Sequence, residues 1–131
     1  MQRTKISTSN APVAIGPYSQ AIRYGQFVYT SGQIALDPAS GALIGDNVQL
    51  QTHRVLQNLQ AVLNSAGTSL ASVIKTTVFL TRMSDFQAMN TAYATYFDES
   101  NDLMPARSTV AVAELPRNAL VEIECVALVE N

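Results

Sequence analysis

The segment from about Val48 to Ala66 constrains the fold of this chain most, because its core-type residues recur at intervals of three and four. The side chains on this stripe are Thr52, Val55, Leu56, Leu59, Val62, Leu63 and Ala66. Polar residues fill the opposite side, which predicts an amphipathic helix. Asp46 or Asn47 can cap its start, and Gly67 stands where a helix commonly ends. Such a helix must bury its stripe against another layer of structure.

Segments rich in β-branched and aromatic residues lie on both sides of this helix and predict strands. The expected strands are Ser19 to Tyr24, Phe27 to Ser31, Val73 to Leu80, Ser108 to Ala113 and Leu120 to Val129. A second helix, with Ser84 as its cap, carries an apolar stripe of Phe86, Met89, Tyr93, Tyr96 and Phe97. The order ββ-α-β-α-ββ predicts an α+β fold with two helices packed on one face of a mixed β-sheet.

The expected strand from Val73 to Leu80 offers apolar side chains to both faces of the sheet. Strict alternation puts Ile74, Val78 and Leu80 on one face, and Val73 and Phe79 on the other. Two helices cover one face only, so the second face needs a partner. We therefore predict a homo-oligomer with its sheets packed inward and with binding sites at the interfaces between subunits.

Composition narrows the class of protein. A length of 131 residues fits one domain spanning 1–131. Hydrophobic residues make up 47% of the chain and charged residues only 14%, a composition that excludes intrinsic disorder. The net charge is −2 and the lysines and arginines form no run, so we expect no nucleic acid partner. We find no stretch near the roughly 20 apolar residues that span a bilayer and no apolar signal-peptide core. We expect a cytoplasmic protein without membrane contact.

Cysteine and histidine each occur once, as Cys125 and His53. A structural zinc site needs about four such ligands, so this chemistry is excluded. Cys125 lies in an apolar run and is expected to be buried and inert. His53 has no serine or cysteine motif beside it and is expected to face solvent. The glycines are dispersed and form no phosphate-binding loop, and we expect neither a metal nor an organic cofactor.

Two polar residues stand where the local pattern favours apolar ones. Arg107 follows Pro105 at the start of an apolar strand, and its planar guanidinium suits a carboxylate. That carboxylate is either a ligand or a salt-bridge partner within the protein. Asn90 interrupts the stripe of the second helix, and a buried amide must form hydrogen bonds. It either ties down a loop or contacts a ligand.

Glu122 and Glu124 alternate with apolar residues and therefore share one face of the last strand. One interpretation is a solvated strand face. The other follows from Val126 and Leu128, which continue the same face as apolar side chains. A carboxylate beside such a surface tends to have a raised pKa, which suits proton transfer near neutral pH.

Several separated motifs, in order, resemble those of the RidA (YjgF) family. They are Ala14 to Ala21, Thr30 to Ile34, Lys75 to Leu80, Pro105 to Ser108, Leu115-Pro116 and Val121 to Glu124. The resemblance extends from about residue 5 to residue 129. It implies a chorismate-mutase-like fold of the bacillus type and a homotrimer with clefts between its subunits. It also implies hydrolysis of 2-imino acids and enamines (2-aminoacrylate, 2-iminobutanoate, 2-iminopropanoate) to 2-keto acids and ammonia, without a cofactor.

The resemblance also implies roles for individual residues. It assigns the substrate carboxylate to Arg107 and the attacking water to Glu122, and it counts Tyr18 among the catalytic residues that line the pocket. The substrate-binding positions carried over with Arg107 are Ser31, Gly32, Asn90 and Thr109. Many members have cysteine where this chain has Thr109, a departure that concerns redox behaviour more than deamination.

Two other classes of function stay open at this stage. The same pocket would also suit a non-catalytic regulator that binds a keto acid or an amino acid, because carboxylate binding and carboxylate chemistry use the same arginine. RNA cleavage or a chaperone-like role is the third class. The acidic charge balance and the absence of a histidine pair argue against RNA cleavage.

Overall fold

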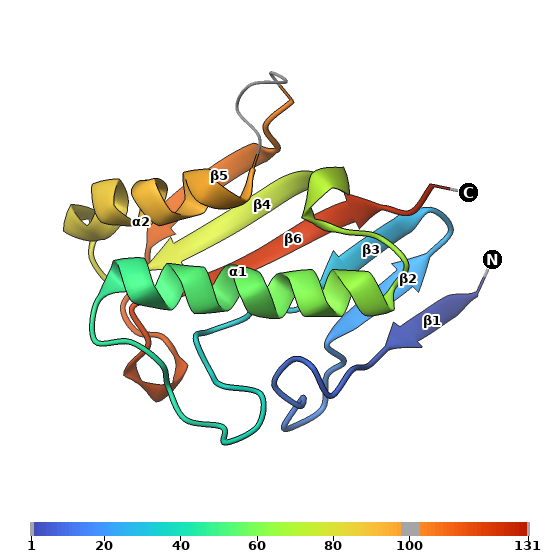
Figure 1. The fold of residues 1–131 in the computed structure, drawn as a ribbon, viewed down its shortest axis with the longest axis horizontal. Helices are drawn as coiled ribbons and strands as arrows, with labels where there is room; N and C mark the ends of the chain where they lie inside the picture. Colours follow the sequence, from blue (N-terminus) through green and yellow to red (C-terminus); the bar gives the residue numbers. More distant parts are fainter. Residues whose placement is uncertain (1, 98–102, 131) are drawn as a thin grey trace.

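Within residues 2–97 and 103–130, which the computed structural model describes, six strands form one mixed sheet with two helices on one face (Figure 1). The strands are β1 (Arg3–Ile6), β2 (Ala21–Tyr24), β3 (Phe27–Thr30), β4 (Val73–Leu80), β5 (Ala106–Ala111) and β6 (Val121–Leu128). The helices are α1 (Val48–Ser65) and α2 (Phe86–Tyr93). The strand order is β1-β2-β3-β6-β4-β5, and only the β4–β5 pair is parallel. The predicted α+β arrangement is confirmed.

The ends of α1 agree with the sequence. The Asn47 side-chain oxygen accepts a hydrogen bond from the Leu50 N–H at 2.9 Å and caps the first turn. At the other end Gly67 has a φ of +85°. The Gly67 N–H donates to the Asn64 carbonyl and the Thr68 N–H to the Leu63 carbonyl, which is the glycine-dependent helix ending expected here.

The start of α2 differs from the prediction. Ser84 does not cap it, because Ser84 lies inside a 3₁₀ turn, Met83–Asp85, that leads directly into the helix. The Phe86 N–H donates to the Met83 carbonyl, and no side chain caps either start. The backbone of the turn therefore accepts a hydrogen bond from an N–H group at the start of the helix that a capping serine would otherwise satisfy.

The two faces of β6 are sharply different. Its helix-facing residues Val121, Ile123, Cys125 and Ala127 are buried in the core with α1 and α2. Glu122, Glu124, Val126 and Leu128 are half-buried on the opposite face, as predicted. We call this second side of the sheet the open face. Phe27, Tyr29 and Val110 also lie on it by register and are exposed.

The predicted assignment of side chains to the two faces of β4 was wrong at the start of the strand. Val73, at 6% exposure, joins Val78 and Leu80 in the core, whereas Ile74 is 42% exposed. The cause is a register shift against β6 between Val73 and Lys75. One extra residue reverses which side chains face the core on either side of it. Phe79 lies on the open face as expected.

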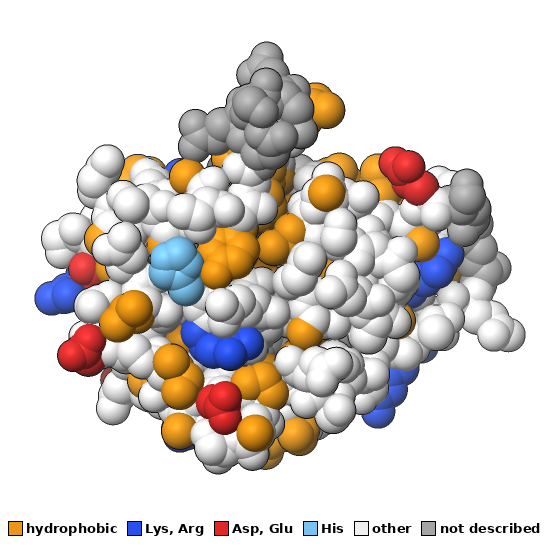
Figure 2. Space-filling view, viewed as in Figure 1, with side chains coloured by type: hydrophobic (Ala, Val, Ile, Leu, Met, Phe, Trp, Pro, Cys, Tyr) orange, Lys and Arg blue, Asp and Glu red, His pale blue; other side chains and the backbone are white. Residues whose placement is uncertain are grey.

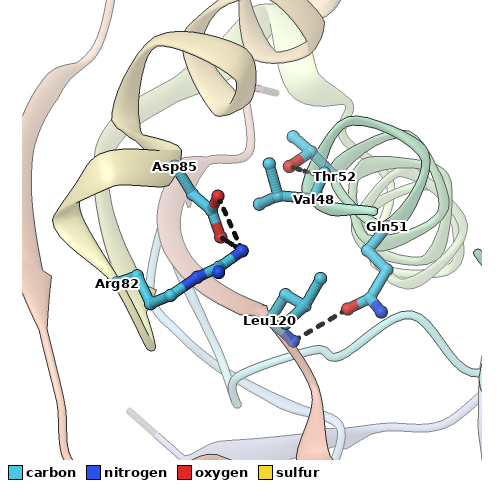
Figure 3. Close-up of polar contacts among 6 residues, drawn as sticks. All are labelled: Val48, Gln51, Thr52, Arg82, Asp85 and Leu120. Carbon is cyan, nitrogen blue, oxygen red and sulfur yellow. Dashed lines mark hydrogen bonds and ion pairs between the residues drawn. The ribbon is translucent and has the colours of Figure 1, made fainter. Parts of the chain in front are cut away.

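A buried glutamine ties α1 to the segment that enters β6. The Gln51 amide nitrogen donates to the Gly45 carbonyl at 3.0 Å, and its oxygen accepts from the Leu120 N–H at 2.9 Å. Figure 3 shows the bond between Gln51 and Leu120 beside the Thr52 hydroxyl, which donates to the Val48 carbonyl. The contact fixes the start of the strand that carries Glu122.

Among the described residues, no helix has the length and apolar character needed to cross a membrane.

Candidate active site

Glu122 lies at a cavity of about 230 Å³ beside the segment that precedes β2. Tyr18, which is 53% exposed, and Gly32 line the same cavity. Ile15 and Arg117 contribute to its wall. The structure therefore brings together three of the residues singled out from the sequence, Tyr18, Gly32 and Glu122, which we call the Glu122 group.

Gly32 lies close against Glu122. A Cβ atom on Gly32 would lie 2.7 Å from both Cδ and Oε2 of the Glu122 carboxylate, so any other residue here would force that carboxylate to move. The neighbouring residue Gln33 pairs through its backbone with Ile123 of β6. This pairing draws the Gly32 backbone against the carboxylate, so glycine serves here for space.

The environment of Glu122 favours its neutral form. Burial raises the pKa of this carboxyl above its ordinary value, and the nearby charge of Glu124 raises it further. Among residues 2–97 and 103–130 the one ion pair joins Arg82 to Asp85, so no described cation lies within ion-pair distance of Glu122. A carboxylate of this kind is suited to accept and return a proton near neutral pH.

Ser31 borders the Glu122 group, but its hydroxyl has a structural partner. The hydroxyl donates to the Ser19 carbonyl at 2.6 Å, and the Ser31 N–H donates to the Gln20 carbonyl at 2.9 Å. These bonds join the end of β3 to the segment containing Tyr18. Ser31 therefore holds one wall of the cavity in place.

Arg107 lies in β5 on the helix side of the sheet. Its guanidinium carbon is 4.8 Å from the ring centre of Tyr93 and 5.5 Å from that of Phe86, both in α2. The guanidinium makes no hydrogen bond or ion pair with any other described residue, so the salt-bridge alternative finds no partner in this part of the chain. With Asn90 and Met104 it lines a cavity of about 490 Å³.

Two buried polar atoms near Arg107 lack partners. The Oδ1 atom of Asn90 and the Oγ1 atom of Thr109 have no hydrogen bond in the described structure. Thr109 is two residues from Arg107 along β5 and shares its face. Unpaired buried polar atoms are rare in folded proteins, so each needs an explanation. Arg107, Asn90 and Thr109 form the second cluster of sequence-derived candidates, the Arg107 group.

The two groups lie on opposite faces of the sheet. Arg107 pairs with Thr76 of β4, whose buried side chain faces α2. Glu122 pairs with Phe79, which faces the other way. One chain therefore does not bring Arg107 beside Glu122, and a pocket that contains both needs residues from two copies.

The aromatic surroundings of Arg107 were not identified from the sequence as part of a site. Phe86 and Tyr93 are seven residues apart and so share a face of α2. This spacing is typical of an ordinary apolar stripe that packs into the core. Only the register of β5 against β4 places a guanidinium over them. The available signal was a cationic residue two positions after Pro105, at the start of an apolar strand.

Comparison with known proteins identifies the family. The family model described as Endoribonuclease L-PSP matches residues 8–129. The chain belongs to the RidA (YjgF) family. The structure of a Rid-family protein from Yersinia pestis superimposes with a TM-score of 0.93 at 47% identity, covering 98% of this chain and 100% of that one. The resemblance inferred from the motifs is confirmed.

Two RidA-family relatives have names that state an activity. The 2-iminobutanoate/2-iminopropanoate deaminase of Mus musculus is 47% identical over 126 residues, 96% of this chain and 91% of that protein. The protein of the same name from Salmonella typhimurium is 44% identical over 123 residues, 94% of this chain and 95% of that protein.

Proposed function

We propose that this chain hydrolyses 2-imino acids and their enamine forms, including 2-aminoacrylate, 2-iminobutanoate and 2-iminopropanoate, to 2-keto acids and ammonia. The observation that carries the proposal is the guanidinium of Arg107, which borders an open cavity and has no hydrogen-bonded or ionic partner among the described residues. The deaminase names of mouse and Salmonella relatives, which align with nearly the whole chain, support it.

We further propose that the protein is a homotrimer with the chorismate-mutase-like fold, each chain being a single domain over 1–131. The exposed aromatic residues Phe27 and Tyr29 on the open face favour burial against another copy. The separation of the Arg107 and Glu122 groups on opposite faces supports an active site shared between two subunits. A cytoplasmic location stays a prediction from the sequence.

In this mechanism the fork of Arg107 donates two charge-assisted hydrogen bonds to the substrate carboxylate. Glu122 of a neighbouring copy takes a proton from water while the water oxygen adds to the carbon of the protonated imine, which gives a neutral carbinolamine. Glu122 then returns this proton to the carbinolamine nitrogen. Ammonia leaves as the carbinolamine hydroxyl gives its proton to the Glu122 carboxylate, which forms the 2-keto acid, and that proton then passes to the released ammonia as ammonium. General acid–base catalysis of this kind contributes roughly 10²–10⁴-fold.

The remaining candidates shape this pocket. Tyr18 and Gly32 border the water site beside Glu122, and Ser31 supports that wall. The Oδ1 atom of Asn90 and the Oγ1 atom of Thr109 are buried without a partner on the Arg107 side. We propose that an ordered water or a small shift of these side chains links them to the bound substrate. All these steps use groups of the chain, the substrate and water.

Substitution of Arg107 tests the proposal. We expect Arg107→Lys to lower kcat/KM for 2-iminobutanoate, generated in place by an amino-acid oxidase, by about 10²-fold, because a point charge does not reproduce the fork. Arg107→Ala should lose at least as much. The matched control is Arg82→Lys, whose side chain is exposed and pairs with Asp85 away from both cavities.

Two results would contradict the proposal. Full activity of a folded Arg107→Ala protein would remove the role of this arginine. Binding of 2-oxobutanoate by the unsubstituted protein without turnover of any imine would favour the regulator instead. We do not extend the proposal to RNA cleavage, despite the description of the family model, because the net charge is −2 and the face seen in Figure 2 shows cationic side chains only as separated positions.

A further inference from the structure

We propose that Tyr93, held by Thr76, is a positioning residue that orients the guanidinium of Arg107 for carboxylate binding. This inference rests on the proposed function, since it gives Tyr93 a role only if Arg107 binds an acid. Tyr93 lines the same cavity as Arg107. The inference goes beyond that function by assigning specificity for the carboxylate partly to an aromatic residue that acts through Arg107.

The contact between Tyr93 and Arg107 is close and confined. Tyr93 is 3% exposed, and the guanidinium carbon lies 4.8 Å from its ring centre. Phe86, seven residues earlier on the same side of α2, adds a second ring at 5.5 Å. A cation within about 6 Å of an aromatic ring centre is attracted by the negative face of the ring. The two rings thus define where the charged end of Arg107 rests.

Thr76 fixes the ring of Tyr93 in turn. The hydroxyl groups of Thr76 and Tyr93 share a hydrogen bond of 2.7 Å, and both residues are buried. Thr76 is also the register partner of Arg107 across the β4–β5 pair. The Phe97 ring packs on Tyr93 at 4.6 Å between centres. Tyr93 is therefore held by the strand next to the one that carries Arg107.

A ring suits this task better than a carboxylate would. An aspartate or glutamate partner would occupy the N–H groups of Arg107 and neutralise its charge, whereas a ring attracts the cation without supplying a carboxylate acceptor. Burial raises the pKa of the Tyr93 hydroxyl, so the residue stays neutral and does not compete as a phenolate. The fork remains available to an acid from outside the chain.

The position of β5 adds to the need for such support. In one chain β5 lies at the edge of the sheet and pairs with β4 alone. Arg107 has a long side chain with many rotamers, and ordering them on ligand binding lowers affinity. Contacts that restrict these rotamers beforehand raise affinity for the carboxylate without taking part in proton transfer. The expected signature is a change in KM and ligand Kd with little change in kcat.

The test compares Tyr93→Leu and Tyr93→Phe with Tyr96→Leu as the matched control. Tyr96 is a nearby aromatic residue whose hydroxyl and ring contact His53 instead of Arg107. The measurements are the Kd for 2-oxobutanoate by calorimetry, KM and kcat for 2-iminobutanoate, and Tm. We expect Tyr93→Leu to raise Kd and KM by roughly 5–30-fold, the upper range of a desolvated cation–π contact, with kcat changed less than about threefold. Tyr93→Phe keeps the ring and should retain most of the affinity.

The outcomes separate this inference from the proposed function. If the unsubstituted protein neither binds 2-oxobutanoate nor turns over the imine, the proposed function fails. If it does both and a folded Tyr93→Leu protein keeps its Kd within about twofold, or if Tyr96→Leu weakens binding equally, the positioning role is wrong. If Tyr93→Leu does not fold, Phe86→Leu replaces it, since this half-buried ring contacts the same guanidinium. Unchanged Kd in that variant would overturn the inference as well.

Discussion

At the scale of single residues, the charge on Glu122 opposes folding, and we propose that the same group serves the reaction. Its pKa in the folded protein lies above the ordinary value of 4.5, first through burial and then through Glu124. The stabilising effect of the neutral form is therefore complete below the unfolded-state pKa and is lost as the pH rises through the folded-state pKa. Above the folded-state pKa the ionised carboxylate destabilises the fold relative to its protonated form.

Glu122→Gln should separate these two effects. We expect its Tm at pH 7 to exceed that of the unsubstituted protein, with the difference shrinking toward pH 4 as the glutamate becomes neutral. At the same time kcat should fall by roughly 10²–10⁴-fold, because the amide accepts no proton. Thermal melting and kinetics over this pH range are the measurements. A lower Tm at pH 7, or unchanged kcat, would contradict this account.

Gly32→Ala should displace the same carboxylate without changing its chemistry. The added methyl group would overlap Cδ and Oε2 of Glu122, so the side chain must move. We expect kcat to drop by about 10-fold or more, since misplacement of a catalytic group by a fraction of an ångström is costly. Binding of 2-oxobutanoate, which we assign to Arg107, should change much less. If the Gly32→Ala protein keeps both the wild-type Tm and an undiminished kcat, the close contact between Gly32 and Glu122 has no catalytic importance.

The residues in and around the two groups differ in how readily they can be identified from the sequence. Arg107 and Glu122 were identified because charge interrupts an apolar pattern. Tyr93 and Thr76 conform to the patterns of a helix stripe and a strand, and so they read as core. Their relation to Arg107 depends on the register of β5 against β4, which alternation along a single strand does not determine.

At the scale of elements, periodicity predicted the long helix and most strands but failed where pairing overrides it. β1 was missed because three of its four residues, Arg3, Thr4 and Lys5, are exposed and polar, and it is defined by its backbone pairing with β2. The bulge at the start of β4 reversed the expected roles of Val73 and Ile74. Both features arise from hydrogen bonds between strands that are distant in sequence.

The link between α1 and β6 provides a test at this scale. Gln51→Leu would remove the partners of the Gly45 carbonyl and the Leu120 N–H, both partly buried. We expect the free energy of unfolding to fall by roughly 1–3 kcal/mol, the range for leaving such groups unsatisfied. Urea denaturation measures this, with Gln57→Leu on the exposed side of the same helix as the control. Equal stability of the two variants would show that the link adds little.

At the scale of the whole molecule, the proposed active site requires two copies of the chain. The sheet separates a cation that can hold a carboxylate from a carboxyl group that can move a proton. Its open face carries apolar and aromatic side chains that need cover. The sequence indicated an oligomer from the second apolar face of β4, yet it did not show which candidate residues belong to which side of the interface.

Complementation between inactive variants tests this central claim most directly. Arg107→Ala and Glu122→Gln proteins are each refolded alone and then together in equal amounts, and deamination of 2-iminobutanoate is measured. If each site takes Arg107 from one copy and Glu122 from another, random mixing leaves about a quarter of the sites with both residues, and the mixture should recover about a quarter of the wild-type activity. A mixed oligomer that stays as inactive as its two parents would contradict the shared site.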